Sequence, residues 1–131
     1  MKTIYETPNL DKKTQYKLMK APDMEKMSAH VGDVISVKCF SMRDDERVVD
    51  EGEVKHNFVL SIMDDQGVIY STNSPTFIRE FSDAYDVFGA EDIHHVEIVG
   101  GKSKAGRNYI TCKYIDWRRK DYAPLRRGIL V

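Results

Sequence analysis

Apolar and polar residues alternate along five stretches of the chain, which is the pattern of strands with one buried face. The predicted strands span residues 33–42, 53–63, 67–72, 94–99 and 107–115. In the second stretch Phe58, Leu60 and Ile62 share one side, so we expect them to face the core. Residues 64–67 are the predicted turn after it, because Gly67 accepts the left-handed conformation that closes a hairpin.

Two helices are predicted from helical spacing and capping residues. A short basic helix spans residues 11–20, with Asp11 able to cap its first turn. The better-marked helix has Ser74 as its N-cap, Pro75 at its first position and Gly89 after its last residue. Its aromatic residues recur at helical spacing, which favours core packing over a ligand surface. They are Phe77, Phe81, Tyr85 and Phe88.

The order strand, strand, strand, helix, strand, strand is that of an OB-fold. The predicted fold is therefore mainly β, an OB-fold-like five-stranded barrel with one helix between strands 3 and 4 and a short N-terminal helix. In this fold strands 2 and 3, and the loops joining strands 1–2 and 4–5, bind oligonucleotides. We expect a single domain over residues 1–116, which includes the N-terminal helical segment, followed by a basic C-terminal tail over residues 117–131.

Charge changes this picture because it is unevenly distributed along the 131 residues. The formal net charge is −1. Residues 100–131 contain nine Lys and Arg against two Asp, a net of +7, whereas residues 1–99 contain eleven against nineteen acids, a net of −8. Halves of opposite sign predict a localised anion-binding surface on an otherwise acidic protein, and a solvated face with a basic tail is the alternative.

The main functional candidate is the stretch from Gly100 to Ile115, which contains no acid. It starts as a glycine-containing basic loop, the predicted connection between strands 4 and 5, and continues as a strand. Its cations are predicted to contact phosphates, and Tyr109 offers a flat surface on which a base can stack. The cations are Lys102, Lys104 and Arg107 in the loop, and Lys113 on the same strand face as Arg107 and Tyr109.

Two further candidates lie outside that stretch. Tyr70, on the predicted third strand, is a second stacking residue if its ring faces the binding groove, and a core position fits the alternation equally well. The tail extends the predicted nucleic-acid track with Trp117, Arg118, Arg119 and Lys120, and its apolar end, residues 129–131, can dock onto a neighbouring subunit or the protein's own body. We therefore predict that the tail helps binding and that a homodimer through it is favoured over a monomer.

The chain also contains three distinctive segments, which are LDKKTQYKL at residues 10–18, TNSPTFIREF at 72–81 and GKSKAGRNYITC at 101–112. Together they resemble small single-stranded DNA-binding proteins of phages and prophages of Gram-positive bacteria. The resemblance covers about residues 10–116 and implies a replication or recombination accessory protein without chemistry of its own. Housekeeping bacterial single-strand binders end in an acidic tail that recruits partners. This chain ends in Arg-Arg-Gly-Ile-Leu-Val, so the resemblance does not extend to that mode of recruitment.

Other chemistries fit the sequence less well. The segment Gly101-Lys102-Ser103 lacks the glycine five residues earlier that a P-loop requires, because that position is Val96. Residues 43–52 are a predicted acidic loop, whose carboxylates suit either a metal nuclease or a solvated surface. The histidines and the two cysteines have no metal-ligand spacing, so we expect no metal, no other cofactor and reduced cysteines.

These observations predict a non-enzymatic, sequence-tolerant single-stranded DNA-binding protein that acts in phage DNA replication or recombination. Phage or host proteins of those processes are its expected protein partners. The alternative is a phage-encoded protein-binding module, an inhibitor or regulator of a host protein, on the same scaffold. No apolar run approaches the roughly 20 residues of a membrane span, and residues 1–10 lack an apolar signal core. We therefore expect no membrane partner and a location in the cytoplasm of the bacterial host.

Overall fold

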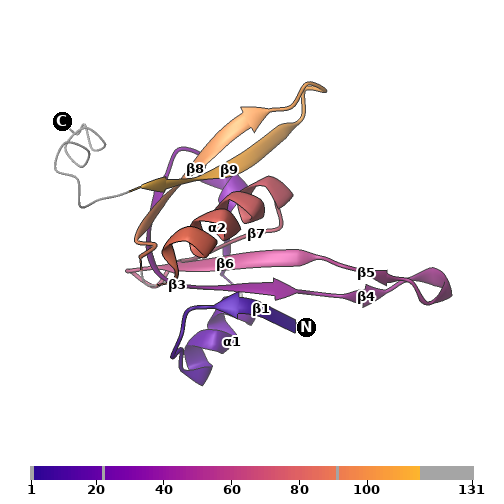
Figure 1. The fold of residues 1–131 in the computed structure, drawn as a ribbon, viewed down its shortest axis with the longest axis horizontal. Coiled ribbons are helices and arrows are strands. Elements are labelled where there is room, and N and C mark those ends of the chain that lie inside the picture. The colour runs from indigo at the N-terminus through magenta and orange to yellow at the C-terminus, as the bar shows by residue number, and fades with distance from the viewer. Residues whose placement is uncertain (1, 22, 91, 116–131) are drawn as a thin grey trace.

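A curled, mostly antiparallel sheet forms the body of the protein in the computed structural model, which describes residues 2–21, 23–90 and 92–115 (Figure 1). Its strand order is β2-β7-β6-β3-β8-β9, with β1 paired to β3 beside this path, and β4 and β5 form a separate two-stranded sheet. The strands are β1 (Lys2–Glu6), β2 (Glu25–Lys26), β3 (Val34–Asp44), β4 (Arg47–Val48), β5 (Val54–Lys55), β6 (Phe58–Asp64), β7 (Ile69–Thr72), β8 (His95–Lys102) and β9 (Asn108–Ile115). The helices are α1 (Lys12–Lys20) and α2 (Pro75–Phe88), with 3₁₀ turns η1 (Met27–Ala29) and η2 (Asp50–Gly52).

The long strand β3 explains the curl, because different strands pair with its two ends on one edge. There β8 pairs with residues 34–36 and β1 pairs with residues 41–44. The other edge pairs with β6 alone, with a register shift between Val37 and Cys39. The fold is mainly β with a half-barrel sheet, and α2 follows β7 and precedes β8 as the sequence predicts.

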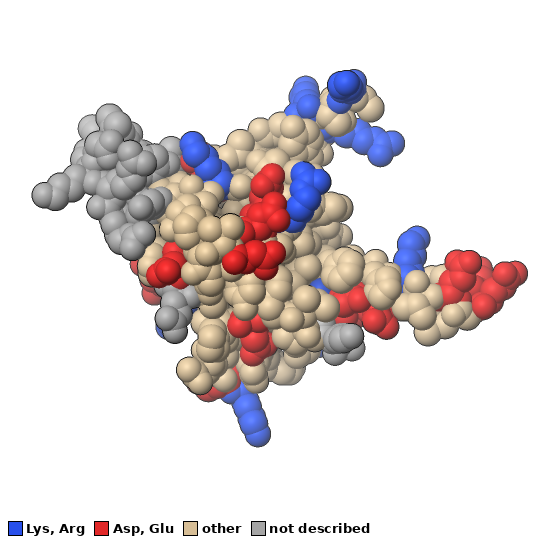
Figure 2. All heavy atoms as spheres, viewed as in Figure 1, with Lys and Arg blue, Asp and Glu red and all other residues tan. Residues whose placement is uncertain are grey.

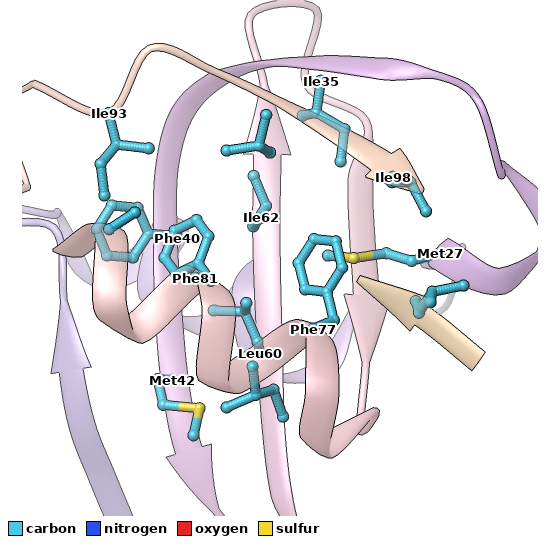
Figure 3. Close-up of a cluster of buried hydrophobic side chains, with 14 residues drawn as sticks. Met27, Ile35, Phe40, Met42, Leu60, Ile62, Phe77, Phe81, Ile93 and Ile98 are labelled. Carbon is cyan, nitrogen blue, oxygen red and sulfur yellow. The ribbon is translucent and has the colours of Figure 1, made fainter. Parts of the chain in front are cut away.

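Helix α2 covers one face of the sheet and closes the main core (Figure 3). Phe77 and Phe81 point from the helix onto Phe40 of β3 and onto Leu60 and Ile62 of β6. The rings of Phe40 and Phe81 meet edge to face with centroids 5.0 Å apart, which is a favourable geometry for an aromatic pair. The predicted core role of the aromatic stripe is confirmed for these two helical residues.

The helix ends follow the capping residues. The Asp11 carboxylate accepts from the Thr14 N–H at 2.7 Å, and the Ser74 hydroxyl accepts from the Phe77 N–H at 3.3 Å. Gly89, with φ of 78°, follows α2. Neither described helix is long and apolar enough to cross a membrane.

Helix α1 covers the opposite face of β3 and β6. A smaller cluster of Leu18, Cys39, Met63 and Ile69 lies beneath it. Arg43 is buried on the same face, where its Nη1 donates to the Leu18 carbonyl at 2.7 Å. Strand β3 is therefore buried on both faces near its centre. Both cysteines of the chain, Cys39 and Cys112, are free thiols.

Several sequence expectations are wrong. Residues 43–52 are not simply an acidic loop, because Arg43 and Asp44 end β3 and are buried. The predicted strand 53–63 is interrupted at residues 56–57, between β5 and β6. Phe58 does not join the core. It is the first residue of β6, the core begins at Leu60, and the Phe58 side chain is 42% exposed.

Other differences are smaller. Phe88, at the end of the aromatic stripe, is 40% exposed and stacks on Tyr114 with ring centroids 4.2 Å apart. Strands β1 and β2 were not predicted. The predicted tail, residues 117–131, lies outside the described residues.

Candidate nucleic-acid interface

The hairpin of β8 and β9 is a regular antiparallel ladder with a tight tip. Pairing continues without a shift from His95 opposite Ile115 to Lys102 opposite Asn108. At the tip the Ser103 N–H donates to the Arg107 carbonyl at 2.9 Å, and the Gly106 N–H donates to the Ser103 carbonyl at 2.9 Å. Gly106 has φ of 82°, a conformation that glycine adopts without strain. The backbone of the tip is thus fixed by its own hydrogen bonds.

Three predicted phosphate contacts lie together on this tip. Lys102, Lys104 and Arg107 are exposed, and the turn brings them to one end of the hairpin. We call β8, β9 and their turn the basic hairpin. Figure 2 shows Lys and Arg gathered at its end. The connecting loop is shorter than expected, because Gly100, Gly101 and Lys102 belong to β8.

Tyr109 of β9 lies opposite Gly101 of β8 in the ladder. Because Gly101 has no side chain, there is room beside it for the tyrosine ring. A Cβ atom built on Gly101 would lie 2.6 Å from Cζ of Tyr109, which is inside van der Waals contact. The tyrosine remains 40% exposed. The glycine therefore positions an aromatic ring, a role that follows from the register of the two strands and is not visible in the local sequence.

A groove of about 940 Å³ adjoins the half of the hairpin nearest its tip. It lies between the hairpin, the end of β7 and the first turn of α2, and its lining includes Lys26, Ser71, Asn73, Thr76, Gly101 and Tyr109. The Ser74 hydroxyl donates to the Ile110 carbonyl at 3.3 Å, so the start of α2 is tied to β9 across this groove. Sequence analysis missed most of these residues because they come from separate elements and only the fold brings them together.

Tyr70 is engaged in packing. It contacts the main core, and its ring edge meets His30 with centroids 5.2 Å apart. His30 in turn lies 3.0 Å from the Glu25 carboxylate and 3.1 Å from that of Asp33. Hydrogen bonds to Glu25 and then Asp33 raise the pKa of His30 above its ordinary value, and burial raises the pKa of Tyr70. We leave Tyr70 out of the proposed stacking residues.

The remaining predicted residues lie away from this groove or outside the described chain. Lys113 is exposed on the face of β9 that includes Tyr109, directly opposite Glu97 in the ladder. The groove lining does not include it among the described residues. Trp117, Arg118, Arg119 and Lys120 lie outside the described residues.

A second projection contrasts with the basic hairpin. Residues 45–57, which include β4 and β5, form what we call the acidic ribbon, and Figure 2 shows Asp and Glu at its end. Val48 and Val54 are a cross-strand pair on it, and Val48 is 77% exposed. The outline of the molecule is hollowed between the hairpin and the ribbon (Figure 2).

The base of the acidic ribbon is fixed by a buried carboxylate. Asp44 accepts from His56 Nδ1 at 2.6 Å and from the Asn57 N–H at 3.2 Å. Glu46 lies 3.8 Å from the same histidine nitrogen, and ligand atoms of Asp44, Glu46 and His56 all lie within 4.8 Å of one another. Sequence spacing did not predict this grouping. Within this group the buried Asp44 carboxylate already has two hydrogen-bond donors, as a buried polar group requires.

Comparisons with known proteins give no family: no family model, no curated protein and no solved structure matches the chain.

Proposed function

We propose that the protein is a non-enzymatic binder of single-stranded DNA with little sequence preference, and that the basic hairpin makes its main contacts. The observation that supports this most directly is the cluster of Lys102, Lys104 and Arg107 at the tip of the hairpin, beside a groove. Lysine and arginine side chains neutralise phosphates and release counterions, which supplies most of the affinity of sequence-independent binding.

The groove supplies the second half of the interaction. Tyr109 holds an exposed ring in place over Gly101, and bases of any identity stack on such a ring. The first turn of α2 lines the same groove, and the amino end of a helix attracts anions. The backbone of the DNA then follows the cations while its bases turn toward the protein.

We further propose that the half-barrel is an OB-fold. Strands β3, β6 and β7, helix α2, and strands β8 and β9 follow the order of that fold, which is a partly open barrel. The loops that bind oligonucleotides in it join strands 1–2 and 4–5. In this chain the connection between strands 4 and 5 is the tip of the basic hairpin, whereas the connection between strands 1 and 2 is the acidic ribbon, whose charge does not suit phosphate contacts.

The biological setting is part of the same proposal. The protein acts in DNA replication or recombination of a phage, in the cytoplasm of an infected or lysogenic bacterium, beside phage or host proteins of these processes. Support comes from the three segments that resemble phage single-strand binders. Two of them, residues 72–81 and 101–112, contribute to the lining of the groove.

The C-terminal tail has two proposed roles, in DNA binding and in homodimer formation. Deletion of residues 117–131 separates them when solution mass and oligo(dT) affinity are both measured. A fall in mass with retained binding assigns the tail to assembly, and a fall in affinity alone assigns its cations to the DNA site. Retention of both mass and affinity removes both roles.

The rival function is a protein-binding module, and the exposed valines of the acidic ribbon favour it. Salt dependence distinguishes the two functions. On single strands the logarithm of the binding constant falls with the logarithm of salt concentration by about 0.7 per neutralised phosphate. Fluorescent oligo(dT) titrated at two salt concentrations should show tight binding at low salt and a steep loss at high salt. Absence of binding at low salt removes the DNA-binding proposal.

A further inference from the structure

A second groove, of about 450 Å³, continues the first one. Asn73 and Pro75 line both, so a path runs from the basic hairpin over the start of α2 to the base of the acidic ribbon. The second groove is otherwise lined by Met42, His56, Asn57, Phe58, Ile78 and Arg79.

Phe58 presents a partly exposed aromatic ring in this second groove. It lies on the face of β6 that buries Leu60 and Ile62, but the core ends before it, and the ring is 42% exposed. An aromatic side chain that is neither in the core nor isolated on the surface, but lines a groove, is available for stacking.

The ring of His56 extends this surface. It lies nearly parallel to Phe58, with a ring centroid distance of 5.8 Å and an interplanar angle of 9°. The histidine is itself oriented by the buried Asp44 carboxylate, which lies 2.6 Å from Nδ1. Because a hydrogen bond orients His56 and its ring is stacked on Phe58, this pair of rings loses less conformational freedom when a ligand arrives than free side chains would.

Charge decides which part of a nucleotide fits here. The acidic residues Asp44 and Glu46 flank His56, so a phosphate is disfavoured beside them. A neutral base stacked on an aromatic ring has no such penalty. Arg79 of α2 also lines this groove and provides a cation for the connecting backbone.

We propose that Phe58, with His56 beside it, is a second base-stacking site on the strand whose phosphates contact the basic hairpin. This inference rests on the proposed single-stranded DNA binding. The two ends of the path then bind different parts of the nucleotide. The hairpin mainly contacts phosphates, and the base of the ribbon mainly contacts a nucleobase.

The test compares Phe58→Ala with a matched control, Phe88→Ala. Phe88 is 40% exposed and also stacked on a ring, but it lies at the far end of α2 and lines neither groove among the described residues. Each protein is titrated with oligo(dT) and with an abasic oligomer of the same length, which keeps the phosphates and lacks the bases. Circular dichroism and thermal melting verify the fold. Phe58→Leu, which keeps an apolar side chain without a ring, is the second variant.

We expect Phe58→Ala and Phe58→Leu to weaken oligo(dT) binding about tenfold and to leave binding of the abasic oligomer unchanged. Phe58→Tyr and Phe88→Ala should bind both probes as the wild type does. If the wild type binds oligo(dT) with steep salt dependence and both Phe58 variants match it, this inference is wrong and the proposed function stands. Equal losses on both probes also overturn base stacking. If the wild type binds neither probe at low salt, the proposed function and the inference fail together.

Discussion

The basic hairpin and the acidic ribbon are both pairs of antiparallel strands that project from the body, yet they differ in charge and in support. The hairpin is paired from His95 to Lys102, and the hydrogen bond from Ser74 to Ile110 ties β9 to α2. The ribbon has only two ladder pairs, Arg47 with Lys55 and Val48 with Val54. The backbone that presents the cations is thus supported by a long ladder and by α2. The backbone that presents the acidic residues is a short ladder outside the main sheet.

This difference shows why net charge is a poor guide to the partner of this protein. A formal charge of −1 conceals a cationic tip and an acidic tip on one molecule. Because the acidic ribbon repels phosphate, it restricts the DNA backbone to the hairpin side of the grooves. Equivalent changes in the two projections should therefore have unequal effects on DNA binding.

The largest effect is expected from removing the cations of the hairpin tip. Lys102→Ala, Lys104→Ala and Arg107→Ala together should lower oligo(dT) affinity at least tenfold at low salt. The salt slope should fall by about two, because each lost phosphate contact removes about 0.7. Fluorescence anisotropy over a range of salt concentrations measures both quantities.

The matched change on the ribbon is Glu46→Gln, Asp50→Asn and Glu53→Gln, which also alters three charges. It should leave the salt slope unchanged and leave affinity equal or slightly higher, because repulsion is reduced. A hairpin triple variant that binds like the wild type, or a ribbon triple variant with weaker binding, contradicts the division between the two projections.

Next in size is the aromatic contact of Tyr109, near the tip of the hairpin. Tyr109→Ala should weaken oligo(dT) binding about tenfold, and Tyr109→Phe should retain it, since stacking needs the ring and not the hydroxyl. Gly101→Val should weaken binding as Tyr109→Ala does. The new Cβ atom would lie 2.6 Å from Cζ of Tyr109 and would displace the ring. Lys104→Ala should mainly flatten the salt slope. A folded Tyr109→Ala protein with wild-type affinity places the site elsewhere.

Removing the hydrogen bonds that anchor each projection should lower the stability of the protein by different amounts. Asp44→Ala removes a buried acceptor from His56 and the Asn57 N–H, and should lower the free energy of unfolding by about 1–3 kcal/mol. Ser74→Ala removes the α2 cap and the bond to Ile110, and should cost about 1 kcal/mol. Urea unfolding measures both. A greater loss for Ser74→Ala, with none for Asp44→Ala, means that the ribbon is not anchored by its buried carboxylate.

The smallest effect is expected for the pH dependence of stability. It concerns His30, which lies in the body of the protein and in neither projection. The pKa of His30 is raised from 6.5 by Glu25 and Asp33, so its ion pairs stabilise the fold fully below pH 6.5, and this stabilisation is lost as pH rises through the higher folded pKa. His30→Gln should therefore reduce stability in mildly acidic buffer by about 0.2–1 kcal/mol, and less at alkaline pH. Thermal melts at several pH values should show the two proteins converging as pH rises. A difference that grows with pH contradicts the assignment.

Much of the fold followed from local pattern. Alternation located β6, β7, β8 and β9, and the cap and stop residues located both helices, because these features depend on neighbours in sequence. Strand β3 was found, but its buried end was not, since Arg43 and Asp44 are polar and their burial depends on Leu18 and His56. Strand β4 lies within residues 43–52, where the sequence predicts a loop because acidic residues are depleted in strands, whereas β5 lies within the predicted strand 53–63.

The site was predicted where its residues are adjacent in sequence and missed where they are not. The tip cations share one turn, so composition was enough to locate them. The face of Phe58 was predicted correctly, but alternation does not specify where the core ends, and the residue emerges in a groove. Asn73, Lys26 and Thr76 join the site only through tertiary packing.

Amide hydrogen exchange with and without saturating oligo(dT) shows directly whether the basic hairpin, and not the tip of the acidic ribbon, contacts single-stranded DNA. We expect slower exchange in residues 100–110 and 73–76, and unchanged exchange at the ribbon tip, residues 48–53. Slower exchange confined to the ribbon tip, or no change anywhere while oligo(dT) is bound, would contradict this expectation.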